Sequence, residues 1–96
     1  MSEYTTRVFK SLPIIDLHGL DRDTARIRVN EFIKDNRKLK KKVIVVNHGK
    51  GSGILKKEVH LLLKNHKSVI NYYIDMFNDG DTIVELKIWQ SSEKVI

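Results

Sequence analysis

The sequence predicts an α/β fold, a two-layer sandwich in which two helices pack on a four-stranded mixed sheet in the order β-α-β-α-β-β. Two apolar runs each end in a His-Gly turn, and each turn is followed by the apolar spacing of an amphipathic helix. Two further strand-like segments, joined by a turn sequence, complete the pattern. A chain of 96 residues is long enough for one such core and too short for a second.

The first strand and the first helix are predicted over residues 12–17 and 22–36. Pro13 stands at the entrance of the strand, where its missing N–H is tolerated. Asp21 is a residue type that caps helices, because its carboxylate accepts hydrogen bonds from first-turn N–H groups. The apolar side chains that follow recur at i, i+4, i+7 and i+8 and form one stripe: Ala25, Val29, Phe32 and Ile33.

The second unit repeats this arrangement. Residues 43–46 are all β-branched, which is typical of a central strand buried on both faces. After the glycine turn, a helix is predicted over residues 53–64. Its apolar stripe has the same spacing as that of the first helix and consists of Leu55, Val59, Leu62 and Leu63.

The last two strands are predicted over residues 68–77 and 82–88, with Asn-Asp-Gly-Asp at 78–81 as the turn between them. Right-handed crossovers make the earlier strands parallel, and the hairpin adds an antiparallel strand.

The domain itself is predicted over residues 13–88, between an N-terminal arm at 1–12 and a C-terminal tail at 89–96. If both helices cover one face of the sheet, the other face is partly bare. The arm, the tail or a partner chain would then shield it. We expect a monomer or a weak homodimer.

The composition excludes several classes of protein. The sequence contains no cysteine, so neither disulfides nor thiolate zinc sites hold the fold together. No apolar run approaches the roughly 18 residues of a transmembrane helix, and the N-terminus lacks the apolar centre of a signal peptide. We therefore expect a soluble, cytoplasmic protein without a membrane partner.

The positive charge is concentrated in one part of the chain. The formal net charge is +6; residues 1–67 carry 16 Lys and Arg against 7 Asp and Glu, whereas residues 68–96 carry 2 against 5. The basic part contains both His-Gly turns. This distribution favours a polyanionic partner such as DNA or RNA, although lysines also serve simply to keep small proteins in solution.

Both His-Gly turns follow parallel strands, so they lie at the carboxyl edge of the sheet, where open α/β folds bind ligands. In the second turn the glycines let the backbone N–H groups approach a phosphate, and a lysine adds a full charge. Its Gly-x-Gly-x-Gly spacing matches neither the dinucleotide fingerprint nor a P-loop. The predicted phosphate-binding residues of this turn are Gly49, Lys50, Gly51, Ser52 and Gly53.

Three residues at the turns are candidates for phosphodiester chemistry: Asp16, His18 and His48. Asp16 could orient a histidine, act as a base or hold a divalent ion such as Mg²⁺ or Mn²⁺. His18 titrates near neutral pH, which suits proton transfer, and His48 could supply a complementary acid or contact the phosphate. In the structural alternative, Asp16 only caps N–H groups in its turn and either histidine only hydrogen-bonds a loop carbonyl.

Other basic residues are predicted to extend the phosphate track: Arg22, Arg26, Lys56 and Lys57. The run at 37–42 carries five positive charges at the opposite edge of the sheet, where it either contacts nucleic acid or complements the C-terminus of the first helix. His60 is expected on the surface of the second helix and His66 in the turn that follows it. With histidines this scattered, we expect no structural metal site.

The two motifs together resemble the Smr (small MutS-related) domain family. The resemblance rests on Ile15-Asp16-Leu17-His18-Gly19 and on residues 46–56, which contain the sequence HGKGSG, and it extends over residues 13–88. It implies a fold similar to the C-terminal domain of bacterial translation initiation factor three. It also implies nucleic-acid binding, endonuclease activity on DNA or RNA and, in MutS2-type proteins, roles in recombination and ribosome rescue. His18 departs from the arginine of many MutS2-type members.

The leading hypothesis from the sequence is a structure-directed or non-specific endonuclease that nicks DNA or RNA and binds it mainly through phosphates. The alternative is a non-catalytic module that binds structured RNA, the ribosome or branched DNA. A third reading, a small protein that binds a phosphorylated metabolite, is weaker because a two-layer domain of this size encloses a small ligand poorly.

Overall fold

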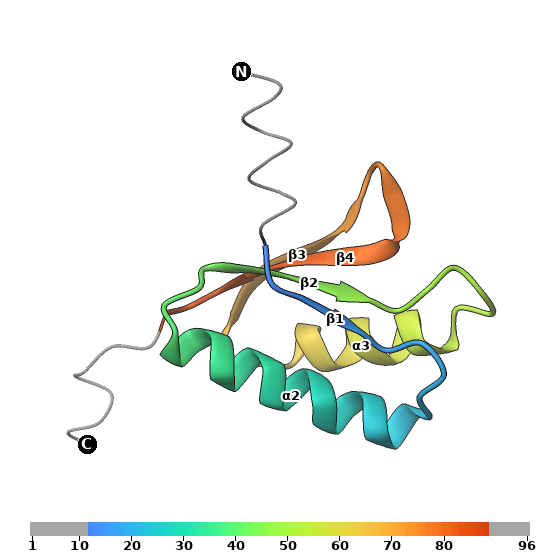
Figure 1. The fold of residues 1–96 in the computed structure, drawn as a ribbon, viewed down its shortest axis with the longest axis horizontal. Helices are drawn as coiled ribbons and strands as arrows, with labels where there is room; N and C mark the ends of the chain where they lie inside the picture. Colours follow the sequence, from blue (N-terminus) through green and yellow to red (C-terminus); the bar gives the residue numbers. More distant parts are fainter. Residues whose placement is uncertain (1–11, 89–96) are drawn as a thin grey trace.

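Four strands form one mixed sheet in the order β1-β2-β4-β3 (Figure 1). The structure is a computed structural model and describes residues 12–88. Strand β1 (Ile14–Asp16) pairs in parallel with β2 (Val43–Asn47), and β4 (Asn78–Leu86) pairs antiparallel with both β2 and β3 (Val69–Asp75). The predicted α/β class and element order are confirmed.

Both helices cover the same face of the sheet (Figure 1). Helix α2 (Arg22–Lys38) lies under β1 and β2, and α3 (Ile54–Lys64) lies beside it. Alternate residues of the strands face the helices, as the period of two in a strand requires. One buried cluster joins the two layers and contains Leu17, Ala25, Val29, Ile33, Ile44, Val46, Val59, Leu63, Val84 and Leu86. The predicted helix stripes therefore form the core.

The opposite face of the sheet carries an apolar row that crosses all four strands. The strand register aligns Ile14, Val45, Ile83 and Tyr73. The two inner members are buried, at 7% and 3% exposed, whereas Ile14 and Tyr73 are 54% and 45% exposed. This face is thus partly bare at its two edges. The arm and the tail that were expected to shield it lie outside the described residues, except for Leu12.

The predicted hairpin turn is wrong. The chain reverses at Met76-Phe77, and β4 already begins at Asn78, so the Asn-Asp-Gly-Asp segment belongs to the strand. The register slips between Ile74 and Asp75, which leaves extra residues on β4 as an irregularity. Tertiary pairing decides this, because β2 takes the segment as its partner and aligns Asn47 with Asp81. The side chain of Asn78 accepts the Gly80 N–H inside the strand instead of in the loop.

Candidate phosphate-binding site

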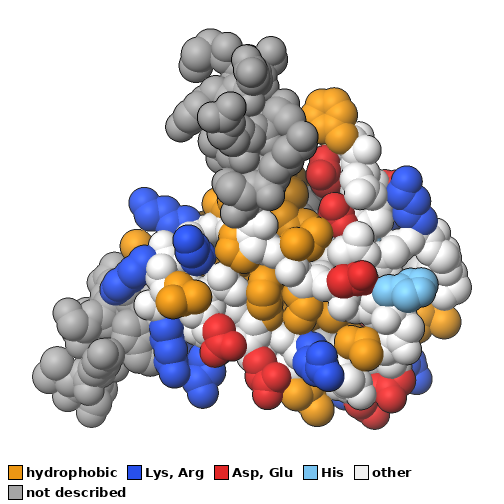
Figure 2. Space-filling model, viewed as in Figure 1, with side chains coloured by type: hydrophobic (Ala, Val, Ile, Leu, Met, Phe, Trp, Pro, Cys, Tyr) orange, Lys and Arg blue, Asp and Glu red, His pale blue; other side chains and the backbone are white. Residues whose placement is uncertain are grey.

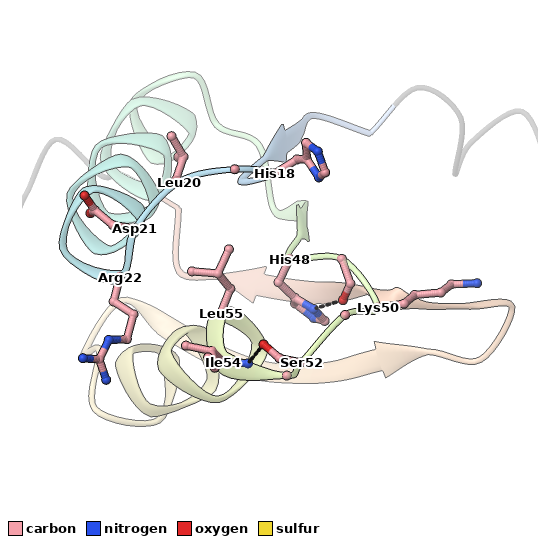
Figure 3. Close-up of a pocket in the computed structure, with 13 residues that line it drawn as sticks. His18, Leu20, Asp21, Arg22, His48, Lys50, Ser52, Ile54 and Leu55 are labelled. Carbon is pink, nitrogen blue, oxygen red and sulfur yellow. Dashed lines mark hydrogen bonds between the residues drawn. The ribbon is translucent and has the colours of Figure 1, made fainter.

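The two His-Gly turns meet at the carboxyl ends of β1 and β2 and enclose a pocket of about 590 Å³ (Figure 3). It is lined by residues 18–22 from the first turn and by residues 48–55 from the second. The strands β1 and β2 run in parallel, and this pairing brings the two turns together from positions thirty residues apart. The edge of the sheet selected from the sequence is therefore the one that is hollowed.

The second turn, which we call the glycine loop (residues 48–53), presents backbone N–H groups to the pocket. Gly49 and Gly53 adopt φ of 82° and 85°, a left-handed conformation that side chains disfavour. Gly53 is the N-cap of α3 and offers no side chain, and the first turn of the helix contains no acid. The first intrahelical bond runs from the Lys57 N–H to the Gly53 carbonyl. The three preceding N–H groups, those of residues 54–56, have no helical acceptor.

Contact with Ser52 compensates only weakly, since its Oγ lies 3.4 Å from the Ile54 nitrogen. The positive end of α3 therefore opens into the pocket, as an anion requires. The amide of Gly49 is different from the other loop amides. Its N–H already donates to the Gly80 carbonyl at 3.1 Å.

His48 is buried at the root of the glycine loop, at 6% exposed. Its Nε2 lies 2.8 Å from the hydroxyl oxygen of Thr82, and its Nδ1 lies 3.1 Å from the carbonyl oxygen of Gly49 (Figure 3). Its backbone N–H donates to the Gly80 carbonyl at 2.9 Å. Both ring nitrogens of His48 are therefore engaged inside the protein, although the residue lines the pocket.

Asp16 and His18 occupy different positions relative to the pocket. His18 lines the pocket and is exposed. Asp16 does not line it; the carboxylate oxygen Oδ1 accepts the backbone N–H of His18 at 2.9 Å, which fixes the first turn. In the sheet Asp16 aligns with Asn47 and Asp81 on the face away from the helices. The capping contact that the sequence left open as an alternative role is thus present.

The basic residues around the pocket are not equivalent. Lys50 and Arg22 lie toward opposite ends of it (Figure 3), and the Nζ of Lys50 lies 3.6 Å from an Asp79 oxygen on the exposed surface. Arg26 lies outside the pocket, where it pairs with Asp23 and, at 2.8 Å, with Glu58 of α3. The Glu58 hydrogen bond raises the pKa of Arg26. Arg26 therefore ties α2 to α3.

Lys56, Lys57 and the basic run at 37–42 do not line the pocket either. Lys56 is half-buried and Lys57 is exposed. The side chain of Arg37 donates from Nε to the Lys87 carbonyl at 2.6 Å. Basic side chains gather at the end of the molecule where α2 ends, away from the glycine loop (Figures 1 and 2).

The expectation that His60 is a surface residue is wrong. His60 is half-buried, its Nε2 lies 2.8 Å from the Thr82 hydroxyl oxygen, and its ring packs edge-on against Tyr72. Burial lowers the pKa of His60, and the charges of His48 and Lys56 lower it further. Its spacing of three residues before the buried Leu63 is the sequence signal that places it on the flank of the apolar stripe.

Asp81 and Thr82 were not singled out from the sequence. Asp81 is 8% exposed, and its Oδ1 has no hydrogen-bond partner among residues 12–88. Burial raises the pKa of Asp81, an effect that a hydrogen bond from Asn47 opposes. Within the same range, no group of three or more His, Asp or Glu side chains is arranged to hold a metal ion. No described helix is long and apolar enough to cross a membrane.

The fold and both motifs have counterparts in known proteins. The family model of the Smr domain matches residues 15–87. Endonuclease MutS2 from Clostridium botulinum (strain Eklund 17B / Type B) is 42% identical over 76 residues, and that of Geobacillus sp. (strain WCH70) is 38% identical over 76 residues. Each match covers 76% of this chain and 10% of the relative, so the chain spans about a tenth of the length of these curated relatives.

Solved structures agree with this fold. The Smr domain of Thermus thermophilus MutS2 has a TM-score of 0.77 and 26% sequence identity, and the match covers 79% of this chain and 99% of that one. YdaL, a stand-alone small MutS-related protein from Escherichia coli, has a TM-score of 0.73 at 20% identity, a likeness of fold alone, over 77% of this chain and 63% of that one. With the family match over residues 15–87, the chain belongs to the Smr domain family.

Proposed function

We propose that this chain binds nucleic acid through its phosphates and nicks a phosphodiester bond held in the glycine loop. One observation carries the proposal: the open N-terminus of α3, Lys50, Arg22 and the exposed His18 converge on a single pocket. Its MutS2 relatives are named endonucleases, which supports the same chemistry for a chain that spans only a tenth of their length.

The phosphate would lie against the N–H groups at the start of α3, where the helix dipole and the backbone donors favour an anion. Lys50 adds a positive charge on one side and Arg22 on the other, which lets the site grip neighbouring phosphates along a strand. These contacts involve no base edges. Binding is therefore expected to depend little on sequence and to weaken steeply with added salt.

Proton transfer in this site is assigned to His18. Its imidazole faces the pocket, and among residues 12–88 no hydrogen bond holds its ring. It can take the proton from the attacking hydroxyl or give one to the leaving oxygen. Asp16 acts on His18 through the backbone, by accepting its N–H, and is a positioning residue. With a single carboxylate nearby, the residues present do not form a metal cage, and no metal enters the scheme.

Cleavage and binding assays on separate variants test the proposal. Labelled single-stranded DNA, branched DNA and RNA are incubated with the chain in EDTA, Mg²⁺ or Mn²⁺. We expect His18→Ala to lower the cleavage rate roughly 100-fold or more, since general acid–base catalysis contributes about that much. Its affinity should stay near the wild-type value. Lys50→Ala should weaken binding, and His66→Ala, outside the pocket, is the matched control. Wild-type cleavage by His18→Ala removes this assignment.

A non-catalytic binding module is the second candidate, and one observation favours it. Both ring nitrogens of His48 are engaged internally and Asp16 lies outside the pocket, so His18 is the one predicted catalytic side chain that faces it. A chain that binds structured RNA or branched DNA but cleaves none of these substrates under any of the three metal conditions would establish this candidate instead. An excess of mononucleotide would not displace the bound strand in either case, because the contacts extend over several phosphates.

A further inference from the structure

A line of hydrogen bonds beneath the glycine loop joins α3, β4 and the end of β2. Both His60 and His48 place their Nε2 atoms 2.8 Å from the hydroxyl oxygen of Thr82. The Nδ1 atom of His48 then lies 3.1 Å from the carbonyl oxygen of Gly49, at the start of the loop. Thr82 is 0% exposed, so bulk water does not compete for its hydroxyl. The line therefore ends at the peptide from which the loop departs.

The final acceptor determines the position of every proton in this line. A carbonyl oxygen only accepts hydrogen bonds, so His48 carries its proton on Nδ1. In a neutral imidazole the Nε2 atom is then an acceptor, and the Thr82 hydroxyl donates to it. The oxygen of Thr82 in turn accepts from His60, whose proton is on Nε2. Each group has one role, and the donors all point from α3 toward the loop.

Neighbouring contacts favour this neutral arrangement. The Tyr72 ring packs edge-on against His60 with a centroid separation of 5.2 Å, which restrains the imidazole. A second proton on His48 would aim two N–H donors at one hydroxyl oxygen. It would also bring a charge close to His60, because the two rings are 5.9 Å apart. Burial lowers the pKa of His60, which agrees with a neutral ring.

We propose that His60 and Thr82 are positioning residues of the glycine loop, which hold His48 as the neutral tautomer with its proton on Nδ1 and so anchor the Gly49 carbonyl. The backbone anchors the same peptide, because the N–H groups of His48 and Gly49 both donate to the Gly80 carbonyl. The loop therefore departs from a fixed point, and its N–H groups are oriented before an anion arrives. Its effect on ligand affinity rests on the proposed function; the tautomers do not.

NMR of the full chain labelled with ¹⁵N in histidine reads the tautomers directly, without any ligand. At neutral pH we expect His48 to be protonated on Nδ1 and His60 on Nε2. Thr82→Val keeps the β-branched shape but removes the hydroxyl, so His48 should shift to a mixture of tautomers, whereas Thr82→Ser should keep the wild-type pattern. A wild-type His48 protonated on Nε2, or an unchanged His48 in Thr82→Val, would overturn the proposal.

Binding of a short fluorescein-labelled oligonucleotide shows whether the arrangement reaches the loop. His60→Gln keeps an N–H donor for Thr82, and His60→Leu removes it. We expect affinity to fall roughly five- to tenfold in His60→Leu and Thr82→Val, and by about twofold or less in His60→Gln and Thr82→Ser. Equal affinity in all four variants would contradict a positioning role.

The half-buried His60 pair carries the test if Thr82→Val fails to fold, which circular dichroism checks. If even the wild-type chain binds no DNA or RNA, the proposed function fails. The NMR pattern of the wild type and of the His60 variants then still decides whether the line positions His48.

Discussion

The two His-Gly turns have related sequences, yet their electrostatics are opposite. In the first turn, Asp16 accepts the His18 N–H at 2.9 Å and Asp21 accepts the Thr24 N–H at 2.7 Å. Asp23 adds a further acid to the first turn of α2. In the glycine loop the N-cap is Gly53, no acid follows in the first turn of α3, and Lys50 adds a positive charge. One helix N-terminus is thus neutralised by its own chain, and the other is left open.

This difference assigns separate tasks to the two turns. The hydrogen bond from Thr24 lowers the pKa of Asp21, so this carboxylate is ionised at neutral pH and occupies the positive end of α2. A phosphate has little to gain there. The glycine loop offers unpaired N–H groups instead, while the first turn contributes His18 and Arg22 as the facing wall of the pocket. A repeated motif can therefore build one site from unequal halves.

The comparison is broken most severely by giving the glycine loop an acid of its own. Asp and Asn both tolerate the left-handed conformation of Gly53, so Gly53→Asp and Gly53→Asn differ mainly in charge. We expect Gly53→Asp to weaken oligonucleotide binding by about 1 to 2 kcal/mol, because the new carboxylate caps α3 and repels phosphate. Gly53→Asn should bind far better in the same anisotropy titration. Equal affinities would show that charge at this position does not matter.

The next effect concerns Asp81, the buried carboxylate beneath the glycine loop. Burial raises its pKa, so at neutral pH the folded state holds a carboxylate that water would solvate better. Asp81→Asn removes that charge and should raise the free energy of unfolding by about 1 kcal/mol, as measured by urea denaturation. A lower free energy of unfolding in Asp81→Asn would mean that the carboxylate has an essential partner.

A smaller effect is expected at the cap of α2. Asp21→Ala removes the acceptor of the Thr24 N–H and should lower the thermal midpoint by a few degrees, whereas Asp21→Ser keeps a capping oxygen and should retain most of it. Oligonucleotide affinity should not fall in either variant, since the first turn is not the phosphate cradle. A marked loss of affinity in Asp21→Ala alone would instead place the anion at α2.

The smallest effect is the pH dependence of the same cap. Because the folded-state pKa of Asp21 lies below its ordinary value of 3.8, the unfolded chain takes up the proton first as pH falls. The stabilisation is therefore complete above that value and is lost as pH falls through the folded-state pKa. Thermal melts of the wild type and Asp21→Ser between about pH 5 and 2 should converge at the acid end. Parallel curves would contradict the capping role.

Local patterns predicted the parts of the fold in which local and tertiary preferences agree. The stripes on α2 and α3 lie in the core because a 3.6-residue period leaves one face to bury. The Asn-Asp-Gly-Asp segment failed for the opposite reason. Its residues suit a turn, but pairing with β2 and the acceptance of two N–H groups by Gly80 keep it in β4.

The candidate site divides in the same way. The glycine loop and His18 could be selected from the sequence because glycine, lysine and histidine state their chemistry locally. The internal bonds of His48, the ion pairs of Arg26 and the burial of His60 could not, because their partners are distant in the chain: Thr82 in β4 and Glu58 in α3.

The sequence by itself determined the element order, the two turns and the positive charge around them, because helix periodicity, strand composition and glycine are local properties. Only the tertiary structure decided which turn remains open to an anion and which histidine faces the pocket. Those outcomes depend on hydrogen bonds between β4, α3 and the glycine loop, and such bonds exist only after the sheet has brought the segments together.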